Sequence, residues 1–311
     1  MTAPAPRPSR RREGLLPTDV ADALSEVLAR ATAAIRENEP GSRDGADIEH
    51  VHQMRVATRR IRAYLKAAKP ALDPAAADRL RADLAELAGT LGEVRDLDVM
   101  IDRMHSEAAA LGDPDTGALE RLIGRLEVDR RAARGQLLAE LDDASFGEML
   151  AELDEAAAAP PVADPWADLK QLAGLEWEKL AKARAKLVSR FGDTPPDDDL
   201  HALRIYGKRA RYAAELLTGP GGGGSGRRKG GAAIRRYLVA LSVFQEVLGN
   251  HQDACVLEDQ LRELVSDSDD TEAALAAGRV VEGCRERCVQ ARIEYPGAWE
   301  AVRAAAIVAF G

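Results

Sequence analysis

The chain has 311 residues, of which 46% are hydrophobic and 31% charged, and its formal net charge is −9 at pH 7. This is the composition of a globular protein, and the acidic balance argues against a general nucleic-acid binder, which is usually basic overall. No apolar run reaches the ~18 residues that a membrane span needs, and no apolar core follows the basic residues at 7–12. Neither a membrane helix nor a signal peptide is expected, and the chain is predicted to be cytoplasmic.

The chain is predicted to be helical because alanine, leucine, glutamate and arginine dominate its composition. Residues 1–14 are expected to form a disordered basic tail. Apolar periodicity and breaking residues predict helices at 17–38, 47–69, from Pro74 past residue 100, 116–142 and 145–156. Pro40-Gly41-Ser42 is expected to end the first of these, and Gly112-Asp113-Pro114 to form a turn.

The stretch 156–165 is rich in proline and alanine and predicts a linker between two halves, 15–155 and 166–311. In the second half, helices are expected at 166–190, 197–217, 232–266, 270–294 and 297–309. The glycine-rich segment 219–231 is expected to be a flexible loop. The fold class is therefore all-α.

Two segments of the chain repeat the same pattern, one in each half. VHQMRVATRRIRAYL at 51–65 matches LHALRIYGKRARYAA at 200–214, and LGEVRD at 91–96 resembles LGNHQD at 248–253. In the first match the ionisable residues recur at identical spacing: His52 with His201, Arg55 with Arg204, Arg59 with Lys208, Arg60 with Arg209, and Arg62 with Arg211. Two copies of one helical unit facing each other would bring these basic helices together.

A basic stripe is predicted on the first of these helices. His52, Arg55, Arg59, Arg62, Lys66 and Lys69 follow each other at steps of three and four residues and so share one helix face. Val51, Met54, Thr58, Ile61, Leu65 and Ala68 take the same steps and predict an apolar stripe about 100° away. No acidic residue lies within 50–70 or 200–214. Because like charges four residues apart repel, the missing partner is expected to be an external anion.

Other interpretations stay open for several of these residues. Asp96, Asp98 or Asp253 could pair with the arginines from neighbouring helices, which would make the stripe structural. His52 and His201 lack a companion ligand at metal spacing, so contact with an anion or a hydrogen bond is favoured over a metal role. Cys255, Cys284 and Cys288 are expected to be buried or idle thiols, with no further ligand near the last two.

Four strings in order resemble the signature of the CHAD domain, the conserved-histidine α-helical domain. They are VHQMRVATRRIRAYLKAAKP, LGEVRDLDVM, LHALRIYGKRARYAAELL and FQEVLGNHQDACVLEDQL, and the resemblance extends over about 17–309. It implies two four-helix bundles related by a pseudo-twofold axis around a basic central channel. It also implies binding of inorganic polyphosphate and association with polyphosphate granules, with other granule proteins as further candidate partners.

The resemblance and the basic stripe together give the candidate polyphosphate-binding residues. They are His52, Arg55, Arg59, Arg60, Arg62, Lys66, Arg95, His201, Arg204, Lys208, Arg209, Arg211, Tyr212, Arg235 and Arg236. LGNHQD departs from the pattern, because His251 and Gln252 stand where the first copy has Val94 and Arg95. No nucleotide-binding GxxxxGK[ST] loop and no catalytic set is evident, so no enzyme and no cofactor are expected. The alternatives are an accessory enzyme of polyphosphate or phosphate esters, and a nucleic-acid binder.

Overall fold

A computed structural model of the chain describes residues 19–112, 115–192, 194–218, 231–266 and 269–311. Its regular elements are α1 (Asp19–Asp44), α2 (Ile48–Ala67), the 3-10 helix η1 (Lys69–Ala71), α3 (Pro74–Leu111), α4 (Asp115–Asp142), α5 (Ala144–Ala158), α6 (Leu169–Phe191), α7 (Asp197–Glu215), α8 (Gly231–Ser266) and α9 (Thr271–Phe310). The predicted all-α class is confirmed. The predicted tail 1–14 and loop residues 219–230 lie outside the described residues, as does part of the turn at Gly112.

Aspartate side chains begin several of these helices. Asp47, Asp73, Asp168 and Asp270 each take an extended backbone conformation and accept hydrogen bonds from backbone N–H groups in the first turn. These groups have no partner within the helix, so each cap contributes about 1 kcal/mol.

The prediction that Pro40-Gly41-Ser42 ends the first helix is wrong, because α1 continues to Asp44 with Pro40 inside it. Tertiary contacts hold the last turn in place. The Arg43 guanidinium donates to Asp142 and to the carbonyl oxygen of Leu141 (2.6 Å) at the end of α4. Arg134 Nη2 donates to the carbonyl oxygens of Ser42 and Arg43, each at 3.3 Å. These contacts outweigh the hydrogen bond that proline removes.

The two predicted C-terminal helices are one, because α9 passes through Pro296 without ending. Proline inside a helix costs about 3 kcal/mol. The residues on either side, Tyr295, Trp299 and Val302, are buried, and burying a large apolar side chain stabilises by about 1.5–3 kcal/mol. Packing therefore decides the helix boundary at this position.

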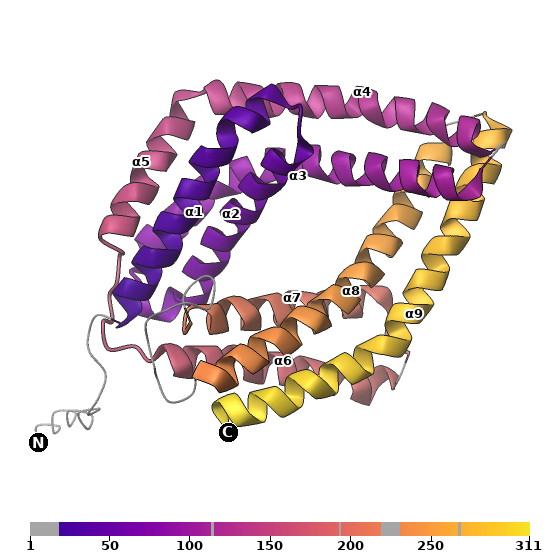
Figure 1. Cartoon of the computed structure of the whole chain (residues 1–311). Helices are drawn as coiled ribbons and strands as arrows, with labels where there is room; N and C mark the ends of the chain where they lie inside the picture. Colours follow the sequence, from indigo (N-terminus) through magenta and orange to yellow (C-terminus); the bar gives the residue numbers. More distant parts are fainter. Residues whose placement is uncertain (1–18, 113–114, 193, 219–230, 267–268) are drawn as a thin grey trace, which may run out of the picture.

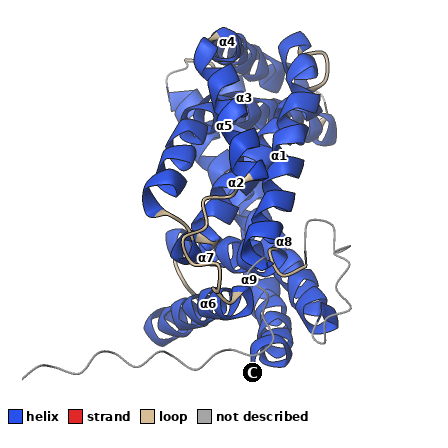
Figure 2. Cartoon of the chain, turned by 90° about the vertical axis from the view of Figure 1, so that its left-hand side faces the viewer, coloured by secondary structure: helices blue, strands red, loops and turns tan. Residues whose placement is uncertain are grey.

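The connection between α5 and α6 is hydrogen-bonded to the backbone at and just after η1. Leu72 and Val162 form an isolated antiparallel bridge. The N–H of Asp73 donates to the carbonyl oxygen of Pro161 (2.8 Å), and the N–H of Ala163 to that of Ala71 (2.9 Å). Figure 2 shows this connection running between α1–α5 above and α6 and α7 below.

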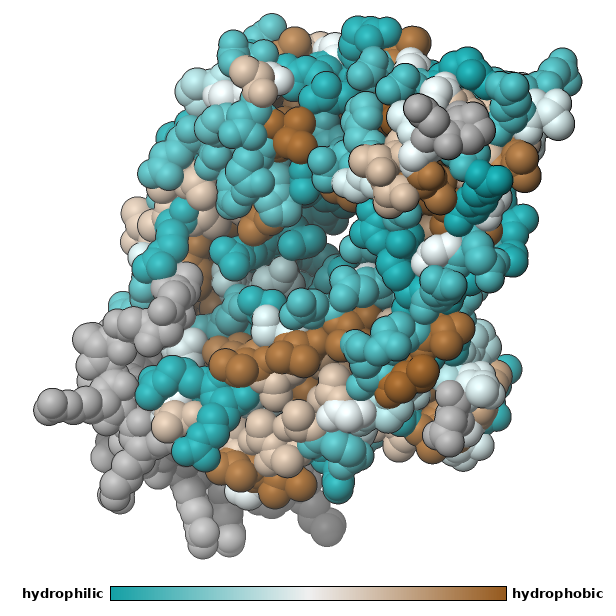
Figure 3. Space-filling model, turned by 45° about the vertical axis from the view of Figure 1, so that its right-hand side comes forward, coloured by the Kyte–Doolittle hydropathy of each residue, from teal (hydrophilic) through white to brown (hydrophobic). Residues whose placement is uncertain are grey.

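The helices form a frame around a central space (Figure 1). α2, α3, α7 and α8 border this space, while α1, α5, α4, α9 and α6 lie on the outside. In the space-filling view the same centre is a hollow bordered by hydrophilic side chains (Figure 3). No described helix is long and apolar enough to cross a membrane.

Three apolar cores hold the frame together. A first core joins α1, α2 and α5 to the start of α3 and the end of α4. A last core joins α6 and α7 to the start of α8 and the end of α9. A middle core is formed by the remaining parts of the four long helices α3, α4, α8 and α9. Helices on both sides of the α5–α6 connection therefore share the middle core. The division of the chain into halves at 15–155 and 166–311 stays a prediction.

Candidate functional site

Helix α2 buries one face and leaves its basic residues at the edge of the first core. All six residues of the predicted apolar stripe, from Val51 to Ala68, are buried. His52, Arg55 and Arg62 are half-buried, while Arg59, Arg60 and Lys66 are exposed. The helical period that buries the apolar face therefore places the cations beside it, as predicted.

Helix α7 is built in the same way in the last core. Leu200, Leu203 and Ala210 are buried, and Gly207 lets the ring of Phe244 approach to 3.3 Å from where a Cβ would stand. The basic residues of this helix, together with His201 and Tyr212, are half-buried.

The two repeated helices contact each other, as the sequence repeat predicts. The Tyr64 hydroxyl on α2 donates to Oε2 of Glu215 at the end of α7 (2.8 Å), and its ring meets that of Tyr212 edge-on at 5.7 Å. Tyr212, a predicted site residue, therefore packs in the junction between the helices. The pairing of Tyr64 with Glu215 was not foreseen, because one tyrosine gives no pattern in the sequence.

Near this junction six basic side chains form what we call the basic cluster: His52, Arg55, Arg59, Arg95, Arg204 and Lys208. Burial, followed by the charges of Arg204, Arg59 and Arg55, lowers the pKa of Lys208 to about 8. Burial also lowers the pKa of Arg204, with a further contribution from Arg59. Side chains from α2 and α7 therefore lie close enough for their positive charges to repel.

His52 and Arg95 extend the basic cluster onto α3. Burial lowers the pKa of His52, followed by the charges of Arg95, Arg59 and Arg55. The imidazole of His52 is therefore neutral at neutral pH and able to donate or accept a hydrogen bond.

Most of the basic cluster lacks an acidic partner. No described carboxylate makes an ion pair with Arg59, Arg95, Arg204 or Lys208, whereas most other arginines of α1, α4 and α9 form one. Nε of Arg204, Nε of Arg62 and Nδ1 of His201 are buried and have no hydrogen-bond partner among the described residues. The two guanidinium Nε–H groups are buried donors, which are costly when left unpaired, so the site favours an added acceptor.

The structural interpretation is correct for part of the set. Arg55 Nη1 donates to Oδ1 of Asp96 (2.6 Å) and to the carbonyl oxygen of Gly92 (3.1 Å). Asp98 pairs with Arg130 of α4 (Nε to Oδ1, 2.5 Å) and not with an arginine of the basic stripe. Asp253 raises the pKa of Arg204 by its charge but makes no ion pair with it.

Arg211 and Lys69 also have internal partners. Nε of Arg211 donates to Oε1 of Glu215 (2.8 Å), one turn along the same helix. Lys69 Nζ donates to both oxygens of Asp78, at 2.8 and 2.9 Å. Arg211 is therefore paired within its own helix, and its contact with polyphosphate stays a prediction.

A second group of cations lies further along the two helices. Burial lowers the pKa of Lys66, and Arg209 is the first of the charges that lower it further. Arg62 adds to this effect, and the guanidinium of Arg209 stacks over the ring of Tyr206 at 5.5 Å. Lys66, Arg62 and Arg209 therefore extend the basic surface away from the basic cluster.

Like His201, Arg211 and Tyr212 described above, Arg60, Arg235 and Arg236 are predicted residues that belong to neither group. The latter three are exposed, and Arg235 and Arg236 lie in the first turns of α8. No described side chain forms an ion pair with them. They add to the positive surface without a defined geometry.

The glycines of the two LG motifs have a role that the sequence did not reveal. A Cβ at Gly92 would meet the guanidinium of Arg55 at 3.9 Å, and one at Gly249 would meet Nη2 of Arg204 at 3.3 Å. Each repeated arginine therefore lies against the repeated glycine of the next motif. The recurrence of Leu-Gly in both copies was the signal for this contact.

The second copy differs at the residues that follow. His251 is 1% exposed and replaces Val94, which is fully buried, as a core side chain. Gln252 stands where the first copy has Arg95, so α3 contributes an arginine at this position and α8 does not.

The expectation that no further ligand lies near Cys288 is wrong, since Cys255 and His251 both lie beside it. These residues come from a different helix, which periodicity along α9 could not show. Within the described part of the chain, neither His52, His201 nor Cys284 belongs to such a group.

Comparisons with known proteins agree with this fold. The family model described as the CHAD domain matches residues 26–262. The structure of PptA from Streptomyces chartreusis is similar with a TM-score of 0.71 at 22% identity, covering 90% of this chain and 99% of that one. The CHAD domain from the plant Ricinus communis is similar with a TM-score of 0.62 at 27% identity, covering 97% and 96%.

Curated relatives are less informative. Uncharacterized proteins from two strains of Mycobacterium tuberculosis are 30% identical over 225 residues, which is 68% of this chain and 39% of theirs. The chain thus spans about two fifths of the length of these relatives.

Proposed function

The chain belongs to the CHAD domain family, and from this membership and the basic cluster we propose that it binds inorganic polyphosphate without turning it over. The observation that carries the proposal is the set of unpaired cations from α2, α3 and α7. Burial, and after it the repulsion among these cations, lowers the pKa of Lys208 and Arg204 in the free protein, and a polyanion would relieve the repulsion.

Polyphosphate suits this arrangement chemically. It is a flexible chain that carries about one negative charge per phosphate. The planar guanidinium of arginine donates to two phosphate oxygens at once and stays charged at every physiological pH. Cations spread over three helices would follow the spacing of charges along such a chain rather than one phosphate group.

The side chains of the basic cluster are cations and a neutral imidazole, and none of its members is a carboxylate. We therefore assign the cluster to binding, and we propose that the protein acts at polyphosphate granules in the cytoplasm, where other granule proteins would be its partners. Incubation with polyphosphate and divalent metal ions checks the non-enzymatic assignment, since sustained phosphate release would contradict it.

Titration of the full chain with long-chain polyphosphate at several salt concentrations tests the function directly. Arg59→Ala combined with Lys208→Ala should weaken binding by at least about tenfold per residue, because a hydrogen bond to a charged group contributes about 1.5–3 kcal/mol. By analogy with single-stranded nucleic acids, the slope of log affinity against log salt should also decrease by about 1.4.

The matched control is Arg131→Ala combined with Lys186→Ala. Both residues are exposed, lie on the outer helices α4 and α6, and remove the same charge. The control should bind like the unmodified chain. Equal losses in the two double variants would indicate general charge attraction and would contradict the assignment to the basic cluster.

Competition separates polyphosphate from nucleic acid. Duplex DNA and RNA are added to the complex at the same phosphate concentration. Displacement by either at concentrations comparable to polyphosphate would favour the nucleic-acid alternative instead.

A further inference from the structure

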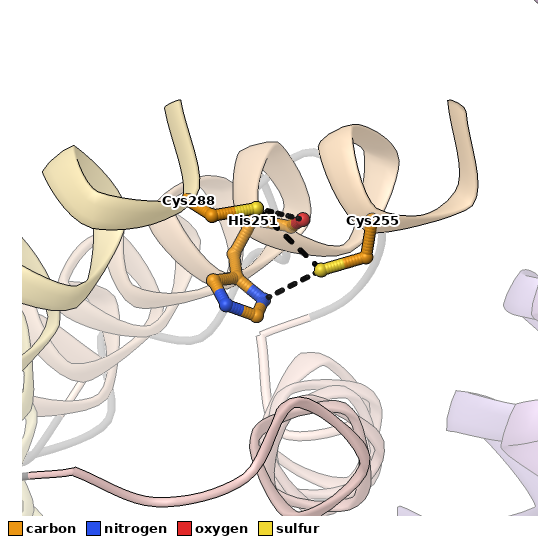
Figure 4. A group of neighbouring side chains, drawn as sticks. All are labelled: His251, Cys255 and Cys288. Carbon is orange, nitrogen blue, oxygen red and sulfur yellow. Dashed lines mark hydrogen bonds between the residues drawn. The ribbon is translucent and has the colours of Figure 1, made fainter. Parts of the chain in front are cut away.

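A group of soft ligands lies outside the basic cluster, between α8 and α9. His251 and Cys255 are one turn apart on α8, and Cys288 faces them from α9 (Figure 4). The Sγ atoms of Cys255 and Cys288 are 3.5 Å apart, and Nδ1 of His251 lies 3.8 Å from Sγ of Cys255. Their ligand atoms all lie within 4.8 Å of one another.

A carboxylate lies on the other side of the imidazole. Nε2 of His251 is 3.0 Å from Oδ1 of Asp197, the first residue of α7. Asp197 is in turn paired with Arg292 of α9, whose Nη1 donates to the carbonyl oxygen of Pro195 (2.5 Å). At this distance Nε2 is beside the carboxylate but makes no hydrogen bond with a described residue. A small rotation of the ring would let Asp197 accept from Nε2, which orients a metal-binding histidine and leaves Nδ1 for the metal.

We propose that His251, Cys255 and Cys288 bind one Zn²⁺ ion. Zinc takes thiolate and imidazole ligands at about 2.3 Å and 2.0–2.1 Å. Tetrahedral angles then place two sulfur ligands about 3.8 Å apart and a sulfur and a nitrogen about 3.6 Å apart, from the same bond lengths. The observed separations of 3.5 and 3.8 Å match this spacing, whereas a disulfide needs about 2.05 Å between the sulfurs.

The ligand types also favour zinc over the abundant hard cations. Thiolate and imidazole are soft or intermediate ligands, while Mg²⁺ and Ca²⁺ require oxygen. His251 is buried and the two cysteines are half-buried. The three protein ligands leave a fourth position for a solvent molecule.

Zinc at this position would link three helices. Two ligands belong to α8 and one to α9, and Asp197 connects the ring of His251 to the first turn of α7. α7 carries Arg204 and Lys208 of the basic cluster, so the metal would fix the start of the helix that presents them. Binding of zinc does not depend on the proposed function.

The test uses the full chain without a histidine tag, reduced with a phosphine rather than a thiol. Titration with Zn²⁺ should give one bound ion per chain, and Co²⁺ in its place should give thiolate charge-transfer absorption. Cys255→Ala and Cys288→Ala should each weaken zinc binding by at least about a hundredfold, more than the loss of an outer partner. Asp197→Asn should weaken it by about 10–100-fold.

Cys284→Ala is the matched control. Cys284 lies one turn before Cys288 on the same helix, is fully buried, and does not belong to the ligand group. This variant should bind zinc like the unmodified chain, with circular dichroism confirming that all variants fold. The proposal is overturned if the reduced chain binds no zinc at one equivalent, if Mg²⁺ competes equally, or if Cys284→Ala loses as much affinity as the other two variants.

Discussion

The two copies of the repeat place equivalent arginines in different electrostatic states. In the first copy, Arg55 is paired with Asp96 and with the carbonyl oxygen of Gly92. In the second copy, Arg204 lies closer to the equivalent glycine, Gly249, and makes no ion pair with a described carboxylate. A repeated spacing thus fixes where a guanidinium lies but not whether its charge is neutralised.

This difference assigns separate roles to the two arginines. Arg55 contributes to holding α2 against α3, although its partner Asp96 is 63% exposed and the pair is therefore weak. Arg204 keeps an unsatisfied buried Nε and a pKa lowered mainly by burial. Of these two arginines, Arg204 therefore keeps the charge that an external anion would neutralise.

The largest expected effect is on polyphosphate affinity. Arg204→Ala should weaken binding by about 10–100-fold, because it removes a charge-assisted contact that has no internal competitor. Arg55→Ala should weaken it by less than tenfold, because Asp96 already neutralises that guanidinium. Isothermal titration at fixed salt measures both affinities, and a larger loss in Arg55→Ala than in Arg204→Ala would contradict the roles assigned to the two arginines.

Stability without ligand should change in opposite directions in the two copies. Arg204→Met removes an unsatisfied buried cation and should raise the free energy of unfolding by about 1 kcal/mol. Arg55→Met loses a partly exposed ion pair and should lower it by less than about 1 kcal/mol. Urea unfolding in the absence of polyphosphate gives both values, and a change of the same sign in both copies would contradict the assigned roles.

The sequence predicted the helices, the repeat and the contact between the two basic helices, because each depends on local periodicity or internal symmetry. It failed at Pro40 and Pro296, where contacts from other helices outweigh a local breaking signal. The sequence also showed no sign of metal ligands near Cys288, because His251 and Cys255 lie on a different helix, α8.

The pairing state of each arginine was beyond prediction for a similar reason. Asp96 and Asp253 stand at equivalent positions of the two copies, and both were candidate partners. Only Asp96 forms an ion pair with its arginine. That outcome depends on side-chain geometry across a helix pair, which residue spacing does not encode.

Lys208 should make polyphosphate affinity depend on pH. Its pKa in the free protein is about 8, below its ordinary value of 10.5, chiefly because of burial. A bound polyanion favours the charged form, so affinity should be constant below about pH 8 and fall as pH rises above it. Titrations at pH 7, 8 and 9 measure this, and Lys208→Arg should flatten the profile because arginine keeps its proton.

The lowered pKa of Lys208 also sets the direction in which the free energy of unfolding of the free protein changes with pH. Between about pH 8 and 10.5 the unfolded chain binds more protons at this lysine than the folded chain, so the contribution of Lys208 to stability rises with pH in that window. Below pH 8 its unfavourable contribution is fully present. A fall in stability across this window that Lys208→Arg abolishes would show that the lysine is not buried as described.

The smallest expected effects come from the two glycines. Gly92→Ala adds a Cβ at ordinary contact distance from Arg55, 3.9 Å, so the helix should gain about 0.5–1 kcal/mol and polyphosphate affinity should not change. Gly249→Ala brings a Cβ to 3.3 Å from Nη2 of Arg204, so the guanidinium must move by a few tenths of an ångström. Affinity should then fall by a few-fold, less than the tenfold change that ~1.4 kcal/mol represents. The two variants add the same methyl group to equivalent motifs, so any difference between them reports the position of the arginine alone, and equal affinities would place Arg204 outside the binding contacts.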